Sequence, residues 1–124
     1  MALLPALASI SLAVSVGCGA FGAHGLRNIL TPSDLAIWEK AVLYHMTHSL
    51  AALFLSLSHH PTLTERRTKT ISALLLVSTV IFSGSLYLLV LLQQRWLGAI
   101  TPIGGTGFIV AWLALAFILA PRKL

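Results

Sequence analysis

The histidines are the side chains of this 124-residue chain best suited to chemistry. His45 and His48 are three residues apart, a spacing that places both rings on one face of a helix. Two imidazoles arranged in this way can share a metal ion or pass on a proton. Two histidines make an incomplete metal site, so further ligands would have to come from His24, from Cys18 or from a second subunit. Cys18 is the only cysteine and cannot form a disulfide within the chain.

The composition indicates the surroundings in which these histidines act. Apolar residues make up 57% of the chain and charged residues only 9%, with a mean hydropathy of +0.92. Soluble domains carry about 25% charged residues, so this chain cannot cover a water-facing surface. The net charge of +5 comes from eight scattered Lys and Arg residues against three acids, and eight cations are too few for a nucleic-acid-binding patch. We therefore expect a lipid bilayer around the protein and no nucleic acid partner.

The charged residues divide the chain into four long uncharged stretches. Crossing a hydrocarbon core of about 30 Å requires about 20 apolar residues in a helix. Backbone groups in lipid must be paired within their own segment, which favours helices. We therefore predict an all-α fold, a single membrane-embedded four-helix bundle with spans at 3–23, 41–58, 70–92 and 101–120.

Helix starts are indicated by two Thr-Pro pairs. Thr31-Pro32-Ser33-Asp34 provides an N-cap, a proline at the first helical position and a carboxylate in the first turn. A helix from 32 to 58 would be about 40 Å long, so its amphipathic start at 32–40 is expected in or above the headgroup layer. Thr101-Pro102 repeats the pairing and predicts where the last helix begins, whereas the third is expected from about Thr70 to Leu92.

The first apolar stretch has two interpretations. Ser15-Val16-Gly17-Cys18 is close to a lipoprotein cleavage box, so the stretch could be a signal peptide. The basic region of a signal peptide is missing, and the box has Ser where an aliphatic residue is usual, which favours a membrane helix. Small residues recur every four positions and form a ridge that another helix can approach closely; they are Ser11, Ser15, Gly19 and Ala23.

Basic residues predict the orientation. Four spans place both termini and the middle loop on one side of the membrane. That side carries five Lys and Arg residues (Arg66, Arg67, Lys69, Arg122, Lys123), and the other carries three (Arg27, Lys40, Arg95). The positive-inside rule then places the N- and C-termini on the cytoplasmic side. We expect the membrane to be the bacterial inner (plasma) membrane.

Two polar stripes are predicted inside the bundle. On the second helix a small and polar stripe opposes an aliphatic face, which is expected to contact lipid. The stripe consists of Ala41, His45, His48, Ala52 and Ser56, and the aliphatic face of Leu43, Met46, Leu50, Leu53 and Leu57. The third helix contributes Ser72, Thr79, Ser83 and Tyr87. Ionisable groups within a membrane often mark a functional site, but a neutral histidine can also join helices at about 0.6 kcal/mol per hydrogen bond.

Four segments, in combination, resemble a known family. They are Gly19-Ala-Phe-Gly-Ala-His-Gly-Leu26, Ala41-Val-Leu-Tyr-His-Met-Thr-His48, Phe82-Ser-Gly-Ser-Leu-Tyr87 and Leu97-Gly-Ala-Ile-Thr-Pro-Ile-Gly-Gly105. Together they resemble the small integral membrane proteins grouped as domain of unknown function 423. The resemblance implies the four-span fold and the membrane location, but no reaction. Gln is frequent in that family where this chain has His45, so the resemblance makes His48 the family-type position and weakens a two-histidine metal site.

Two interpretations of function follow. In the first, the protein binds or transports a small molecule or metal in a polar pocket where the glycine-rich ends of the first and last helices meet. Its ligand-binding candidates are His24, Tyr44, His45, His48, Ser83, Tyr87 and Thr101, and its metal candidates are His45 and His48. In the second, it is a structural or accessory subunit without a ligand. The sequence has no Ser-His-Asp set, P-loop or HExxH motif, so an enzyme is not expected. It names no cofactor, and small-residue ridges would permit a homo-oligomer.

Overall fold

The computed structural model describes residues 3–122, and within them it is all-helical. The elements in chain order are α1 (Leu3–His24), α2 (Pro32–Leu57), α3 (Glu65–Leu92), the short 3-10 helix η1 (Arg95–Ala99) and α4 (Thr101–Leu119). No β-strand is found in this part of the chain. The prediction of an all-α, four-helix membrane fold is confirmed.

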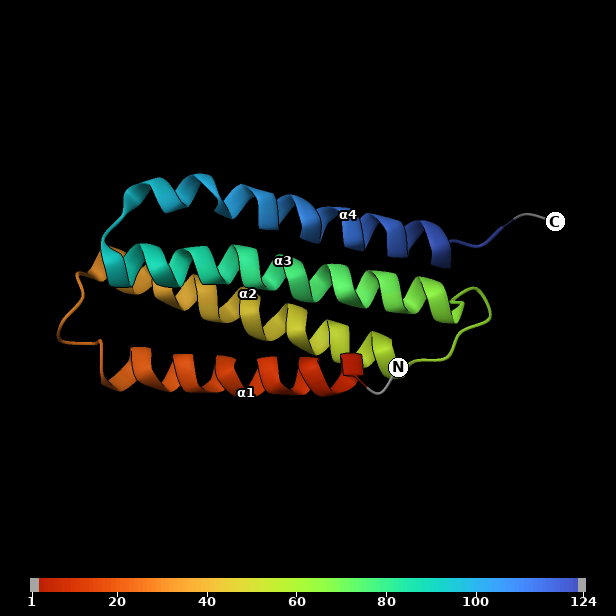
Figure 1. Cartoon of the computed structure of the whole chain (residues 1–124), viewed down its shortest axis with the longest axis horizontal. Coiled ribbons are helices and arrows are strands. Elements are labelled where there is room, and N and C mark those ends of the chain that lie inside the picture. Colours follow the sequence, from red (N-terminus) through yellow and green to blue (C-terminus); the bar gives the residue numbers. More distant parts are fainter. Residues whose placement is uncertain (1–2, 123–124) are drawn as a thin grey trace.

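The helices pack in chain order (Figure 1). α1 lies against α2, α2 against α3, and α3 against α4, with η1 packed on α3 and α4. Short connections make consecutive helices antiparallel neighbours, so the chain enters and leaves the bundle at the same end. α1 and α4 lie on opposite sides of the α2–α3 pair. The glycine-rich ends of the first and last helices therefore do not meet, and the pocket expected between them is not formed.

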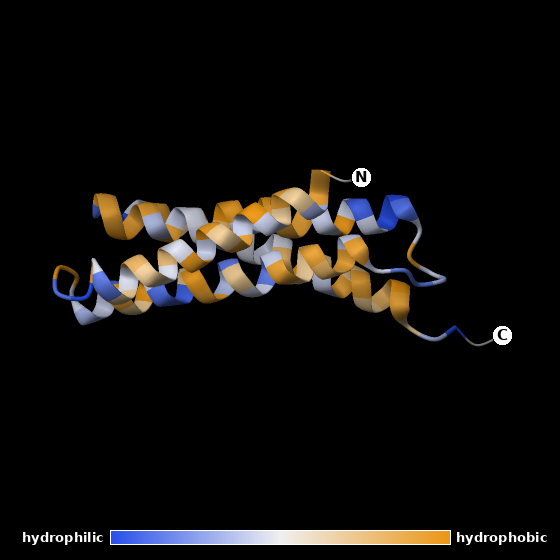
Figure 2. Ribbon diagram, turned by 90° about the horizontal axis from the view of Figure 1, so that it is seen from below, coloured by the Kyte–Doolittle hydropathy of each residue, from blue (hydrophilic) through white to orange (hydrophobic). Residues whose placement is uncertain are grey.

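Among residues 3–122, three segments are long and apolar enough to cross a membrane. They are α1, α3 and the continuous stretch Arg95–Leu119. α2 has 26 residues but a more polar composition, because it carries Asp34, Glu39 and Lys40 near its start. Its crossing over 41–58 stays a prediction, supported by its place between α1 and α3. Hydrophilic residues gather near the two ends of the bundle, as Figure 2 shows.

Local capping explains where the helices begin. Thr31 caps α2, its hydroxyl accepting a hydrogen bond from the Asp34 N–H at 3.1 Å. α3 begins at Glu65 rather than near Thr70, because Thr64 caps it in the same way. The uncharged stretch used to place this helix excludes its first, charged turn. At α4, Ile100 rather than Thr101 occupies the cap position. The Thr101 hydroxyl instead lies 2.6 Å from the Ser85 hydroxyl on α3.

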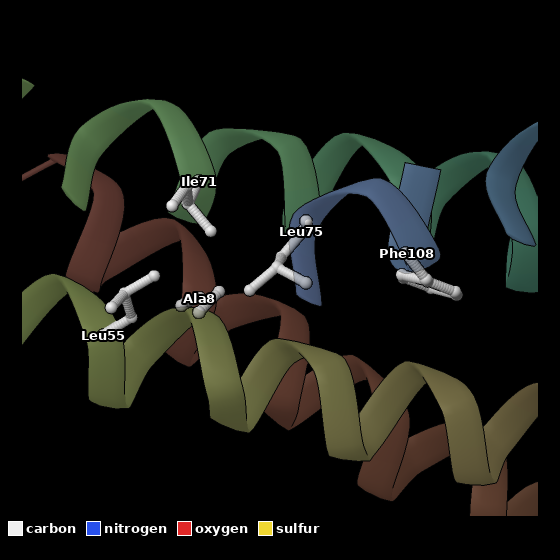
Figure 3. Close-up of a cluster of buried hydrophobic side chains, with 7 residues drawn as sticks. Ala8, Leu55, Ile71, Leu75 and Phe108 are labelled. Atoms are coloured by element: carbon white, nitrogen blue, oxygen red, sulfur yellow. The ribbon is translucent and has the colours of Figure 1, made fainter. Parts of the chain in front are cut away.

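Two hydrophobic clusters hold the helices together. The larger, drawn in Figure 3, comprises Ala8, Ala52, Leu55, Ile71, Leu75, Phe108 and Ala111. The second lies towards the opposite end and comprises Leu26, Trp38, Leu89, Val90 and Leu97. At Gly104 an added Cβ would lie 2.5 Å from the backbone nitrogen of Phe82, so α4 approaches α3 there at a distance that only glycine allows. Large apolar side chains such as Phe54 and Phe117 point outwards, both 74% exposed, as expected for a lipid-facing surface.

The small-residue ridge of α1 faces α2 over most of its length. Ser15 is fully buried, and an added Cβ at Gly19 would lie 3.3 Å from Val42. At the end of the helix Gly22 is buried against Trp38, whereas Ala23 is exposed. The ridge therefore continues through Gly22 and not through Ala23, because a straight helix of 3.6 residues per turn drifts away from a strict four-residue repeat.

Candidate functional site

His45 is the centre of a hydrogen-bonded network that joins three helices. Its ring is buried, at 7% exposure. Nε2 lies 3.0 Å from the Ser11 hydroxyl of α1, and Nδ1 lies 2.9 Å from the Tyr87 hydroxyl of α3. The Ser11 hydroxyl is in turn 2.6 Å from that of Ser49. Both ring nitrogens are therefore engaged, one as donor and the other as acceptor.

Trp38 extends this network towards the end of α1. Its ring centroid lies 4.6 Å from that of Tyr87, and its indole N–H donates to the Cys18 carbonyl at 2.9 Å. Cys18 therefore takes part through its backbone. Because each polar group of this region has a partner, the network suits a role in fixing α1, α2 and α3 relative to one another.

His48 lies one turn further along α2 but faces α4. Its Nδ1 is 2.9 Å from the Tyr44 carbonyl oxygen. A carbonyl can only accept, so Nδ1 carries the proton of the neutral ring and Nε2 presents a lone pair. The ring stacks on Phe108 with centroids 3.7 Å apart, and the edge of Trp112 is near, at 5.9 Å between centroids.

A cavity of about 550 Å³ adjoins His48 between α2, α3 and α4. Its lining residues are mostly aromatic or aliphatic: Leu43, Tyr44, Thr47, His48, Phe82, Gly105, Phe108, Ile109 and Trp112. Within residues 3–122, the only buried side-chain polar atom without a partner is Ser72 Oγ. His48 Nε2 also has no hydrogen-bond partner among these residues. Because Ser72 Oγ is the only unpartnered atom that is buried in that range, His48 Nε2 must be accessible from outside the protein. It is an accessible acceptor on a residue that lines the cavity.

The other predicted site residues lie elsewhere. Ser83 donates to the Ala41 carbonyl at 2.7 Å and joins α2 to α3. Thr101 pairs with Ser85 as described above, and His24 is exposed at the end of α1. The structure thus brings Tyr44 together with His48 in the cavity, and His45 together with Tyr87 in the network. It does not gather all seven candidates in one pocket.

The two histidines proposed as metal ligands face different neighbours. His45 contacts α1 and α3, and His48 contacts α4. No group of three or more His, Cys, Asp or Glu residues that could hold a metal ion occurs among the described residues. The position of the rings therefore gives the metal hypothesis no support.

A charged contact that the sequence-based predictions lack lies at the end of the bundle where α2 begins. Asp34, in the first turn of α2, is only 3% exposed. Its carboxylate accepts hydrogen bonds from Gln93 Nε2 at 2.9 Å and from Arg95 at 3.0 Å. The Gln93 hydrogen bond and the Arg95 contact hold the pKa of Asp34 below its usual value, against the effect of burial. The signal was present in the topology, which places the start of the second helix and the turn after the third on the same side.

Comparison with known proteins places this chain in a family. The family described as "Protein of unknown function (DUF423)" matches residues 18–105. The chain belongs to the DUF423 family. The match includes both histidines of α2 as well as Asp34 and Arg95, and it confirms the resemblance found in the sequence.

The relatives of this DUF423 chain are named membrane proteins. A UPF0382 membrane protein of Staphylococcus saprophyticus is 47% identical over 109 residues, which cover 88% of this chain and 89% of the relative. One of Staphylococcus haemolyticus is 45% identical over 115 residues, or 93% of each chain. The UPF0382 membrane protein YwdK of Bacillus subtilis is 38% identical, with 88% and 89% covered. No solved structure matches the chain.

Proposed function

We propose that this DUF423 protein is a membrane-embedded binding module for a small, largely apolar molecule that carries a hydroxyl or another hydrogen-bond donor. The observation that carries the proposal is the accessible Nε2 lone pair of His48 beside an aromatic cavity. An unpaired polar atom in an apolar environment costs free energy. A donor group on a ligand would remove that cost and fix the ligand's orientation.

The cavity walls favour a ligand with a flat ring. Tyr44, Phe108 and Trp112 lie against the imidazole and Phe82 completes the aromatic lining, and aromatic faces stack on planar molecules. A volume of about 550 Å³ is in the range of small-molecule sites. Such sites commonly combine apolar walls with a few polar groups that select the ligand, which is the combination around His48.

Binding from the lipid fits the geometry better than passage across the membrane. The rim residues Leu43 and Ile109 are 59% and 61% exposed on the outer surface, so a ligand can enter sideways. The polar groups on the α1 side of α2 are paired with one another around His45. We place the protein in a bacterial plasma membrane, because its relatives are membrane proteins of Gram-positive bacteria, with the end that carries Arg66 and Arg67 towards the cytoplasm.

The hydroxyl requirement can be tested with a matched pair of probes. 1-Naphthol has a planar ring and a donor, whereas 1-methoxynaphthalene has the ring alone. Binding to the protein in nanodiscs is followed by quenching of tryptophan fluorescence, and Trp112→Phe identifies the signal from the cavity. We expect naphthol to bind about tenfold more tightly, the effect of one hydrogen bond.

Two histidine variants provide the decisive comparison. His48→Ala should abolish the preference for naphthol, and His24→Ala, at the exposed end of α1, should preserve it. Equal binding of both probes by the wild-type protein would contradict the proposal. So would a His48→Ala protein that keeps the preference.

An accessory subunit without a ligand is the second candidate. The fully paired network around His45 favours it, because that network joins three helices without any need for a ligand. If this is the function, the wild-type protein should bind neither probe in preference to the other, and His48→Ala should lower only the thermal stability.

A further inference from the structure

Uncompensated positive charge gathers where α2 ends and α3 begins. Arg66, Arg67 and Lys69 lie in the first turns of α3, with Glu65 as the one acid beside them. Within residues 3–122 the only salt bridge joins Arg95 to Asp34 at the opposite end of the bundle. Figure 2 shows this hydrophilic start of α3 at the same end as the exit from α4.

A cavity of about 580 Å³ adjoins these cations, between the start of α3 and the end of α4. One part of its lining is polar, formed by Thr64, Arg66, Arg67 and Thr70. The other part is apolar, formed by Ile71 on α3 and by Ala114 and Ile118 on α4. The cavity therefore combines donors and positive charge with an apolar wall, at a membrane end of the bundle.

We propose that this cavity binds the phosphate headgroup of an anionic phospholipid. Guanidinium groups match phosphate oxygens in two-pronged hydrogen bonds, and threonine hydroxyls can add further donors. Arg67 is already held in place, because its Nη1 donates to the Thr62 carbonyl at 2.8 Å. The positive end of the α3 dipole lies beside the same residues.

The apolar wall selects a lipid rather than a free anion. A phosphate ion would make no favourable contact with Ile71, Ala114 and Ile118, whereas the glycerol and the first acyl carbons of a phospholipid can pack against them. Basic pockets between helices at the cytoplasmic face are known to suit anionic headgroups. This site is separate from the His48 cavity and does not depend on the ligand proposed for it.

Lipid retention tests the proposal. The protein is reconstituted in nanodiscs of phosphatidylcholine mixed with phosphatidylglycerol, then released and analysed by native mass spectrometry. The wild-type protein should retain phosphatidylglycerol in preference to phosphatidylcholine. The double variant Arg66→Gln, Arg67→Gln should lower this preference by roughly thirtyfold, since each lost hydrogen bond to the phosphate costs about fivefold.

A control that removes one exposed arginine far from the cavity lies at the other end of the bundle. Arg27→Gln removes an exposed cation from the α1–α2 connection and should change the preference by less than about twofold. Both arginines of the double variant are exposed, so its thermal unfolding should match the wild type. Unchanged retention in the double variant would overturn the proposal, as would an equal loss in Arg27→Gln. Displacement of the lipid by inorganic phosphate would show a free-anion site and would also overturn it.

Discussion

His45 and His48 are neighbours on α2 and differ in what their surroundings leave unpaired. His45 is buried between α1 and α3, and both of its nitrogens have hydroxyl partners. His48 faces α4, uses Nδ1 to bond its own helix and leaves Nε2 free beside a cavity. The same side chain on the same helix therefore serves as a joint in one place and as an available acceptor in the other.

The difference arises from a small rotation around the helix. Residues three apart are displaced by about 60° around the axis, since each residue turns it by 100°. α2 packs against α1 and α3, while its aromatic contact with α4 lies to one side. The small rotation is enough to move an imidazole from one set of neighbours to another. A shared stripe on a helix is thus weak evidence for a shared site.

Replacement of His45 should have the largest effect on the free energy of unfolding. His45→Ala leaves a cavity and removes the partners of Ser11 and Tyr87, so we expect a loss of about 2 to 4 kcal/mol in the free energy of unfolding. His48→Ala, which removes mainly ring stacking, should cost about 1 kcal/mol. Unfolding of both variants in mixed micelles measures the difference.

His45→Gln is the control for this prediction. A glutamine side chain both donates and accepts, so it can engage the same two hydroxyls and should restore most of the lost stability. If His45→Ala is no less stable than His48→Ala, the two histidines are not distinct in the way described here.

A smaller effect is expected where α4 approaches the His48 region. Gly104→Ala places a Cβ against the Phe82 backbone and should cost about 1 to 3 kcal/mol, because α4 must move away from α3. That movement should also separate Phe108 from His48 and weaken probe binding in the cavity. Gly105→Ala is the matched control, since its Cβ would lie 3.8 Å from the Phe82 ring, an ordinary contact. Similar stability of the two variants would contradict this account.

The smallest effect should appear at the charged contact of Asp34, which lies outside both histidine regions. Its folded-state pKa is lowered, so the stability it provides is complete above the unfolded value and is lost as the pH falls through the folded one. Thermal unfolding in detergent should therefore weaken below about pH 4. Asp34→Asn should lower the midpoint at neutral pH and flatten this acid limb, whereas Glu39→Gln, an exposed acid on the same helix, should leave the limb unchanged. An unchanged limb in Asp34→Asn would assign it to another group.

Features set by local chemistry could be predicted from the sequence. The cap at Thr31 depends on residues within one turn, and the helical content follows from the long uncharged stretches. The start of α3 was placed too late because absence of charge marks where lipid begins and not where a helix begins. Thr64 and Glu65 carried the missing signal, a cap followed by an acid in the first turn.

The composition of the candidate site depended on how the helices are placed around one another. His24 and His48 were predicted to share a pocket where the glycine-rich ends of the first and last helices meet, but the chain-order packing separates α1 from α4. The partners of His45, Ser11 and Tyr87, are 34 and 42 residues away in sequence. No local pattern names such partners. The contact of Asp34 with Arg95 was easier to predict than the partners of His45, since the predicted topology already placed both residues on one side of the membrane.

The chain-order packing also has a consequence for how the protein is made. The first hairpin, once inserted, already contains the Ser11–Ser49 pair and the Ser11 contact of His45. The Tyr87 contact can form only after the third helix has entered the membrane. The second hydrogen bond of His45 therefore requires α3 to lie against α2 in the register that brings Tyr87 to Nδ1.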